Sequence, residues 1–223
     1  MVADLERISS LMTNTTTPNG HDAAGSPLPT SPSRVLVADD EHLVAAGMVA
    51  ALTDLGYKVV GPVSDGKQAI QKAREERPDL AVLDIRMQGI DGLAAAETIY
   101  NELHIPVVMV SAYSDPEYVN SGNRIGVFGY LLKPVNRDQL RVGLEVAWSR
   151  FVSQIELADE VNALHNRLEH RKIIEQAKWI IVKRKNVEEP EAMRMLQKQA
   201  RNGRRPLVEV AQAVIESESL LGD

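Results

Sequence analysis

From residue 34 onward, short apolar runs alternate with longer stretches in which apolar positions recur every three or four residues. The short runs are apolar rather than alternating, which is typical of parallel strands covered on both faces. The predicted strands are 34–38, 57–64, 79–85, 105–112 and 127–132, and the predicted helices are 42–56, 65–77, 92–104, 115–126 and 136–151. The pattern predicts an α/β fold, a doubly wound five-stranded parallel sheet with its site at the C-terminal ends of the strands.

After Phe151 this alternation stops and the chain is predicted to be helical, with breaks near 186–190 and 202–206. A heptad seam with spacings of four, three and four is formed by Leu157, Val161, Leu164 and Leu168. Two heptads are short for an independent coiled coil, so we expect the seam to continue from the preceding helix. Pairing with a second protomer is one interpretation, and a helix packed on its own domain is the other.

The last 50 or so residues contain three short apolar helical faces, as in a small three-helix bundle with a modest core. The first 33 residues are rich in Thr, Ser, Pro, Gly and Asn and predict a disordered arm. We therefore expect an arm over 1–33, a doubly wound domain over 34–150, a helical linker or coiled coil over 151–170, and the bundle over 171–223.

Composition limits the possible chemistry. The chain has 223 residues, of which 44% are hydrophobic and 25% charged, and it contains no cysteine. The absence of cysteine excludes disulfides, thiolate metal sites and a cysteine nucleophile. No apolar run long enough for a membrane span and no secretory signal is found, so we expect a cytoplasmic protein with no membrane partner.

Charge is unevenly distributed along the chain. The formal net charge is −6, yet residues 170–205 carry 11 basic and only 4 acidic side chains. An acidic front part and a basic rear part indicate two tasks, and the rear part is suited to a polyanion.

Three acidic residues follow predicted strands. Asp39 and Asp40 come directly after the strand over 34–38, and Asp84 ends the "AVLD" run. In a right-handed βαβ sheet these two strand ends are neighbours, so the carboxylates converge and repel one another. A divalent cation relieves that repulsion, and Mg²⁺ suits one or two carboxylates together with water and phosphate oxygens.

Two polar residues follow the remaining strands, namely Ser111 after "VVMV" and Lys133 after "VFGYLL". A hydroxyl and an ammonium facing a carboxylate cluster are suited to a phosphoryl group on Asp84, since the cation and Lys133 would neutralise its oxygens.

The motifs "ADDE", "LDIRMQGIDG", "VSA" and "YLLKP" together resemble the receiver domain of two-component response regulators, over about residues 34–150. The resemblance implies a sensor histidine kinase as partner and Asp84 as the phosphoacceptor. It implies Mg²⁺ on Asp39, Asp40, Asp84 and the backbone carbonyl of Arg86, with Ser111 and Tyr130 as a switch pair. One departure is Gln88, where proline is commoner. Asp65 and Asp91 are interpreted as helix caps, and Glu41 as a solvated flank or first-turn residue rather than a direct ligand.

The basic tail resembles the ANTAR output domain of antiterminating response regulators, over about residues 171–218, through "IIEQAKWIIVKRKNVEEPEAMRMLQKQARNGRRPLVEVAQAVI". The resemblance implies binding of paired RNA hairpins in nascent transcripts, with a homodimer forming on phosphorylation. Trp179 departs from the family, in which a glycine usually follows "AK"; its ring either packs on a helix or offers a stacking surface for an unpaired base.

The chain is therefore expected to be a phosphoacceptor and RNA binder in transcription antitermination rather than an enzyme. A DNA-binding transcription factor and a protein-interaction output module are the alternatives, although the last helix has few base-reading side chains. The candidate RNA contacts are Lys178, Lys183, Arg194, Lys198, Arg201 and Arg204.

Overall fold

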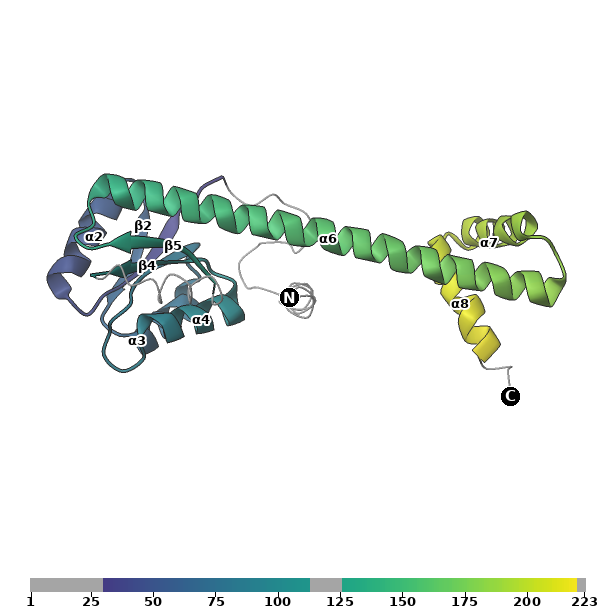
Figure 1. Cartoon of the computed structure of the whole chain (residues 1–223), viewed down its shortest axis with the longest axis horizontal. Helices are drawn as coiled ribbons and strands as arrows, with labels where there is room; N and C mark the ends of the chain where they lie inside the picture. Colours follow the sequence, from purple (N-terminus) through teal and green to yellow (C-terminus); the bar gives the residue numbers. More distant parts are fainter. Residues whose placement is uncertain (1–29, 113–125, 220–223) are drawn as a thin grey trace. The chain divides into compact units, whose positions relative to one another are not determined.

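A computed structural model describes residues 30–112 and 126–219 of the chain (Figure 1). The chain divides into two compact units, which we call the sheet unit, ending at Glu156, and the helical unit, running from Leu157 onward. Nearly all of the predicted arm over 1–33, and all of the predicted helix over 115–126 except Gly126, lie outside the described residues. The domain limits given above remain predictions.

The sheet unit is built on five parallel strands in the order β2-β1-β3-β4-β5. The strands are β1 Arg34–Ala38, β2 Lys58–Val63, β3 Leu80–Asp84, β4 Val107–Ser111 and β5 Val127–Leu132. Every residue of β3 and β4 is buried, because helices cover both faces of the sheet. The predicted α/β class and five-stranded parallel sheet are confirmed.

Helices form a layer on each face of this sheet (Figure 1). They are α2 His42–Asp54, α3 Gly66–Glu76, α4 Gly92–Leu103 and the first part of α6 Arg137–Lys185. On one face, Ala69 of α3 and Ile99 of α4 pack with Leu83 of β3. On the other, Leu52 of α2 and Leu144 of α6 pack with neighbouring strand residues. The sheet unit is thus a three-layer sandwich.

Polar side chains start the helices where the sequence predicts caps. The side chain of Asp65 accepts a hydrogen bond from Gln68 N at 2.8 Å, and that of Asp91 accepts one from Ala94 N at 2.8 Å. Ahead of α6, Asn136 and Gln139 exchange two side-chain to backbone hydrogen bonds of 2.9 Å, a capping box. These caps fix the helix starts that lie beside the strand ends.

Helix α6 continues without a break for 49 residues, from Arg137 to Lys185. The sequence predicts a helix ending near residue 151 and further helix after it; the structure joins both into one element. The expectation that the seam helix continues from the preceding helix is therefore confirmed.

The helical unit consists of the last part of α6 with α7 Glu189–Gly203 and α8 Leu207–Ser219. The breaks fall at the predicted places, and Asn186 and Arg204 adopt positive φ values of 48° and 50° there. Its buried centre, among the described residues, is small and consists of Ala177, Leu196, Val210 and Ala211, surrounded by partly buried aliphatic side chains.

No helix in the described parts of the chain is long and apolar enough to cross a membrane.

Candidate phosphorylation site and nucleic-acid interface

The structure brings the three predicted acids together at one edge of the sheet. Asp39 and Asp40 follow β1, Asp84 ends β3, and these strands are hydrogen-bonded neighbours. One carboxylate oxygen from each of the three lies within 4.8 Å of the others. Asp39 and Asp84 are buried and Asp40 is half-buried, so the cluster is not a freely solvated acidic surface.

Lys133 lies directly beyond β5 and points its ammonium into this cluster. Its Nζ lies 2.9 Å from Asp39 Oδ2 and 3.3 Å from Asp84 Oδ1. The Lys133 side chain is only 10% exposed, so water screens these pairs weakly. The backbone N–H of Lys133 also donates to Ser111 O at 2.7 Å, which ties the ends of β4 and β5 together.

Glu41 takes part in the same cluster, a contact that the sequence did not reveal. Its Oε1 lies 3.1 Å from Lys133 Nζ, although 62% of its side chain is exposed. Its backbone N–H donates to Asp39 Oδ1 at 2.9 Å, which orients that buried carboxylate. The sequence did contain a signal for this contact, namely the three adjacent acids in "DDE". A lysine ammonium that pairs with one of these acids can also reach its neighbours.

The environment shifts the pKa values of the central pair. Burial raises the pKa of Asp84 above its ordinary value, and the charges of Asp39 and Asp40 raise it further, while Lys133 opposes the shift. For Lys133, burial alone would lower the pKa, but hydrogen bonds to Asp39 and Glu41 and the charge of Asp84 raise it above its ordinary value. Lys133 therefore stays charged at neutral pH.

The other predicted site residues lie on β4, on β5 and in the loop after β3. Ser111 is buried at the end of β4, and Arg86 lies exposed in the loop two residues after Asp84. Tyr130 of β5 is half-buried against the core formed with α3 and α4, and burial raises the pKa of its hydroxyl. Their proposed roles as switch pair and carbonyl ligand remain predictions.

The loop after Asp84 approaches α4 very closely. Gly92 begins α4 and donates its N–H to Ile85 O at 2.9 Å. A Cβ at position 92 would lie 1.9 Å from the Asp84 backbone carbonyl oxygen, so only glycine fits. This packing holds the backbone of Asp84 rigidly.

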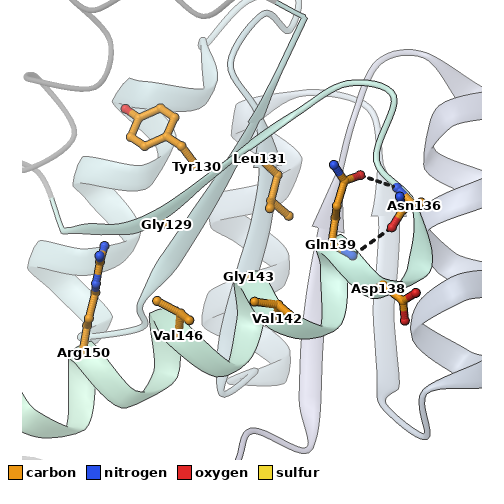
Figure 2. A pocket seen from close by; sticks show the side chains of 10 residues that line it. All are labelled: Gly129, Tyr130, Leu131, Asn136, Asp138, Gln139, Val142, Gly143, Val146 and Arg150. Carbon is orange, nitrogen blue, oxygen red and sulfur yellow. Dashed lines mark hydrogen bonds between the residues drawn. The ribbon is translucent and has the colours of Figure 1, made fainter.

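A groove with a volume of about 570 Å³ lies between β5 and the start of α6 (Figure 2). Gly129 and Leu131 of β5 and Val142, Gly143 and Val146 of α6 line it. The ring of Tyr130 points to the other side of the strand, away from α6 (Figure 2). The Tyr130 side chain thus packs on the core with α3 and α4, while the strand that carries it borders the groove on its other side.

The acidic cluster fits a hard divalent cation. Three carboxylates from Asp39, Asp40 and Asp84 converge, and oxygen ligands are those that Mg²⁺ prefers. These residues could therefore hold a metal ion.

Cations gather on the outer surface of the helical unit. Arg194, Lys198 and Arg201 are spaced four and three residues apart on α7, on the face opposite the buried Ala192 and Leu196. All three are exposed. We call them the α7 cationic stripe. Lys183 at the end of α6 and Arg204 after α7 are also exposed.

Lys178 does not fit its predicted role as an RNA contact. It is 5% exposed, and its Nζ lies 2.5 Å from Glu175 Oε2 and 2.6 Å from Glu189 Oε1. Hydrogen bonds to these two glutamates raise its pKa, so the ammonium is charged and already bound. Lys178 joins α6 to the start of α7 and is not available at the surface.

Comparison with known proteins decides the family. A model of the response regulator receiver domain matches residues 35–145, and a model of the ANTAR domain matches residues 162–215. The transcriptional regulatory protein PdtaR of Mycobacterium tuberculosis (strain ATCC 25618 / H37Rv) is 35% identical over 186 residues, which cover 83% of this chain and 91% of PdtaR. The chain belongs to the ANTAR response regulators. Their two parts, a receiver domain and an ANTAR domain, are those expected from the sequence.

Solved structures similar to this ANTAR response regulator match its receiver part. The signal receiver domain of a modulated diguanylate cyclase from Desulfovibrio desulfuricans G20 is 33% identical, with a TM-score of 0.51. It covers 56% of this chain and 98% of that one. A putative response regulator from Chloroflexus aurantiacus J-10-fl is 25% identical, with a TM-score of 0.50, covering 53% and 99% of the two chains. Both support the receiver fold of the sheet unit.

Proposed function

We propose that this chain is a phosphorylation-controlled, RNA-binding regulator of transcription antitermination. A sensor histidine kinase supplies the phosphoryl group to Asp84, and the helical unit binds paired hairpins in a nascent transcript. The single observation that carries the receiver half is the position of Lys133 within 3.3 Å of Asp84 in a cluster of three carboxylates. The ANTAR match over 162–215 supports the RNA half.

In this proposal an Asp84 carboxylate oxygen attacks the phosphorus of the kinase's phosphohistidine, the P–N bond breaks, the kinase imidazole leaves with a proton, and Asp84 becomes an aspartyl phosphate. Lys133 then pairs with a phosphoryl oxygen, and Ser111 donates a hydrogen bond to another. Asp39, Asp40, Asp84 and the Arg86 carbonyl would hold Mg²⁺, which when bound would neutralise charge on the phosphoryl oxygens. The rigid packing of Gly92 against Asp84 keeps the acceptor in place.

The signal leaves the site through Ser111 and Tyr130. Movement of the Ser111 hydroxyl toward the phosphoryl group frees space near the sheet edge, and the Tyr130 ring turns inward to fill it. Support comes from the half-buried ring on a strand that also lines the groove beside α6. The surface near β4 and β5 is reshaped as a result.

We propose that the reshaped surface favours a homodimer joined along α6. The seam side chains are strongly exposed in the single chain, Leu157 at 62%, Val161 at 41%, Leu164 at 50% and Leu168 at 60%. Four apolar side chains in heptad spacing gain burial when two helices pair. Dimerisation would place two α7 cationic stripes on one RNA.

The receiver half is tested with a small-molecule phosphodonor, because the kinase is unknown. Phosphoramidate or acetyl phosphate with Mg²⁺ is expected to add one phosphoryl group to the wild-type chain, detected by intact mass. Asp84→Asn is expected to add none, because an amide is not a nucleophile. Asp91→Asn is the matched control, since it removes an exposed acid whose capping role asparagine also fills. Equal labelling of the Asp84→Asn chain would disprove the assignment.

The RNA half is tested with labelled two-hairpin RNA, duplex RNA and duplex DNA at two salt concentrations. Preference for the hairpins, with affinity that falls as salt rises, is the expected result. Preference for duplex DNA would support a DNA-binding factor. If no probe bound in a salt-dependent way, the interpretation as a protein-interaction module would be favoured.

Sedimentation of the chain with and without phosphodonor tests the dimer.

A further inference from the structure

Trp179 lies on the outside of the helical unit, although tryptophan is usually largely buried. Its side chain is 50% exposed, whereas the other tryptophan, Trp148, is 5% exposed in the receiver core. On α6 it follows Ala177 by two residues, or about 200° around the helix. Because Ala177 is fully buried in the centre of the helical unit, Trp179 faces away from that centre. Packing on the unit's own helices therefore does not explain this ring.

The heptad seam does not account for Trp179 either. Continuing the seam spacing beyond Leu168 places positions at Arg171, Glu175 and Lys178, all of them charged. The apolar seam therefore ends at Leu168, about three helical turns before Trp179, and pairing along it does not account for the exposed ring.

The surroundings of Trp179 favour a polyanion. Lys183 lies one helical turn further on the same face and is exposed, and no ion pair involves it in residues 30–112 and 126–219. Lys172 lies seven residues earlier on that face and pairs with Glu169 at 2.6 Å. Glu175, one turn before Trp179, is neutralised by its ion pair with Lys178. Residues 170–205 as a whole hold 11 basic and 4 acidic side chains. An exposed indole set among cations is the arrangement that single-stranded RNA readers use, since bases stack on the ring while the cations contact phosphates.

We propose that Trp179 stacks on an unpaired nucleobase of the RNA bound by the helical unit. The inference rests on the proposed RNA function and deepens it, because it requires at least one base outside the paired stems. The ring contributes through contact and not through charge, so its share of the affinity is independent of salt. Lys183 contributes through an ion pair with an RNA phosphate, so its share of the affinity falls as the salt concentration rises.

The test uses the full chain with two probes, a pool of two-hairpin RNAs with fixed stems and randomised loops and a blunt RNA duplex with the same number of phosphates. Trp179→Ala is expected to weaken hairpin binding about 5- to 150-fold, which is the range for one lost base stack. Duplex binding and the salt slope are expected to stay unchanged. Trp179→Phe should restore most of the affinity, and Lys183→Ala, the matched control, should lower the salt slope instead.

Fluorescence gives an independent readout. Trp148 is buried, so hairpin RNA is expected to quench the exposed Trp179 selectively, and the quenched signal should be missing in Trp179→Phe. Equal loss of hairpin and duplex binding in Trp179→Ala, or unchanged hairpin affinity, would overturn the proposal while leaving RNA binding established. Protein-concentration-dependent burial of the ring without RNA would also overturn it, in favour of a protein contact. Failure of the wild-type chain to bind either RNA would remove the proposed function as well.

Discussion

The receiver part and the helical unit place their charged side chains in opposite ways. In the receiver, Asp39, Asp84 and Lys133 converge at one sheet edge with side chains 0%, 7% and 10% exposed. In the helical unit, the cations of the α7 stripe are exposed to solvent. Lys178 of α6 differs from them, since it is buried between two glutamates.

This difference determines how each part depends on single residues. A buried charge needs a partner, so removing one member of the receiver cluster leaves others unpaired in a weakly screened site. Removing one exposed cation changes stability and RNA affinity only a little, because water solvates the site and neighbouring cations still contact the RNA. The receiver should therefore respond to single substitutions sharply, and the RNA surface gradually.

The largest effect is expected from Lys133→Ala. It leaves Asp39 and Asp84 without their cation and should lower the free energy of unfolding of the receiver by about 3 kcal/mol at neutral pH. Because the pKa of Asp84 is already raised, the loss should shrink as the pH falls and the acids take up protons. Urea unfolding followed by Trp148 fluorescence measures this. Lys133→Arg is the control, and an equal loss in both variants would point to packing instead of charge.

A smaller effect is expected from Lys178→Met in the helical unit. The substitution removes the link between Glu175 and Glu189, but both glutamates are about half exposed and can turn to water. The helical unit should lose stability, seen as a lower midpoint in thermal unfolding by circular dichroism, with the receiver transition unchanged. Lys198→Met is the matched exposed control. A loss as large as that of Lys133→Ala would contradict the comparison.

Arg201→Ala should leave stability unchanged and affect only RNA binding. One lost phosphate contact is expected to reduce the slope of log affinity against log salt by about 1. Adding Arg194→Ala should reduce it again by a similar amount, because the cations act as a set. Fluorescence anisotropy with two-hairpin RNA measures both. Complete loss of binding in the single variant would show that the stripe contains one dominant contact.

The smallest effect concerns His104, which ends α4 at a positive φ of 54°. Burial lowers the pKa of its imidazole, and its Nε2 is buried without a hydrogen-bond partner among the described residues. The unfolded chain therefore takes up a proton before the folded one does as the pH falls below about 6.5, which lowers stability. His104→Asn, which tolerates the same backbone conformation, should reduce the loss of stability between pH 7.5 and pH 5.5. An unchanged pH dependence would exclude this histidine.

Features that depend on local sequence could be predicted, and the structure confirms them. Apolar runs located the strands, Asp65 and Asp91 were identified as caps, and acids following β1 and β3 indicated where carboxylates would meet. Each of these depends on neighbours in sequence or on the general rule for parallel sheets.

Contacts between distant side chains were missed for a physical reason. Glu41 reaches Lys133 across 92 residues, and Lys178 reaches Glu189 only because the chain turns between α6 and α7. Charge and spacing alone assigned Glu41 to solvent and Lys178 to RNA. The continuity of α6 through residue 151 is a different case, because it was expected from the sequence, in which no Gly or Pro interrupts the helix at that point.

The enclosure of Lys178 has a practical consequence for mapping the interface by chemical footprinting. An amine reagent needs a deprotonated, reachable amine, and this ammonium is both shielded and held charged by two carboxylates. Its labelling should stay low whether or not RNA is added, whereas Lys183 and Lys198 should become protected only in the complex. Lys178 thus offers an internal reference within the same peptide region, and a rise in its labelling would report unfolding of the bundle.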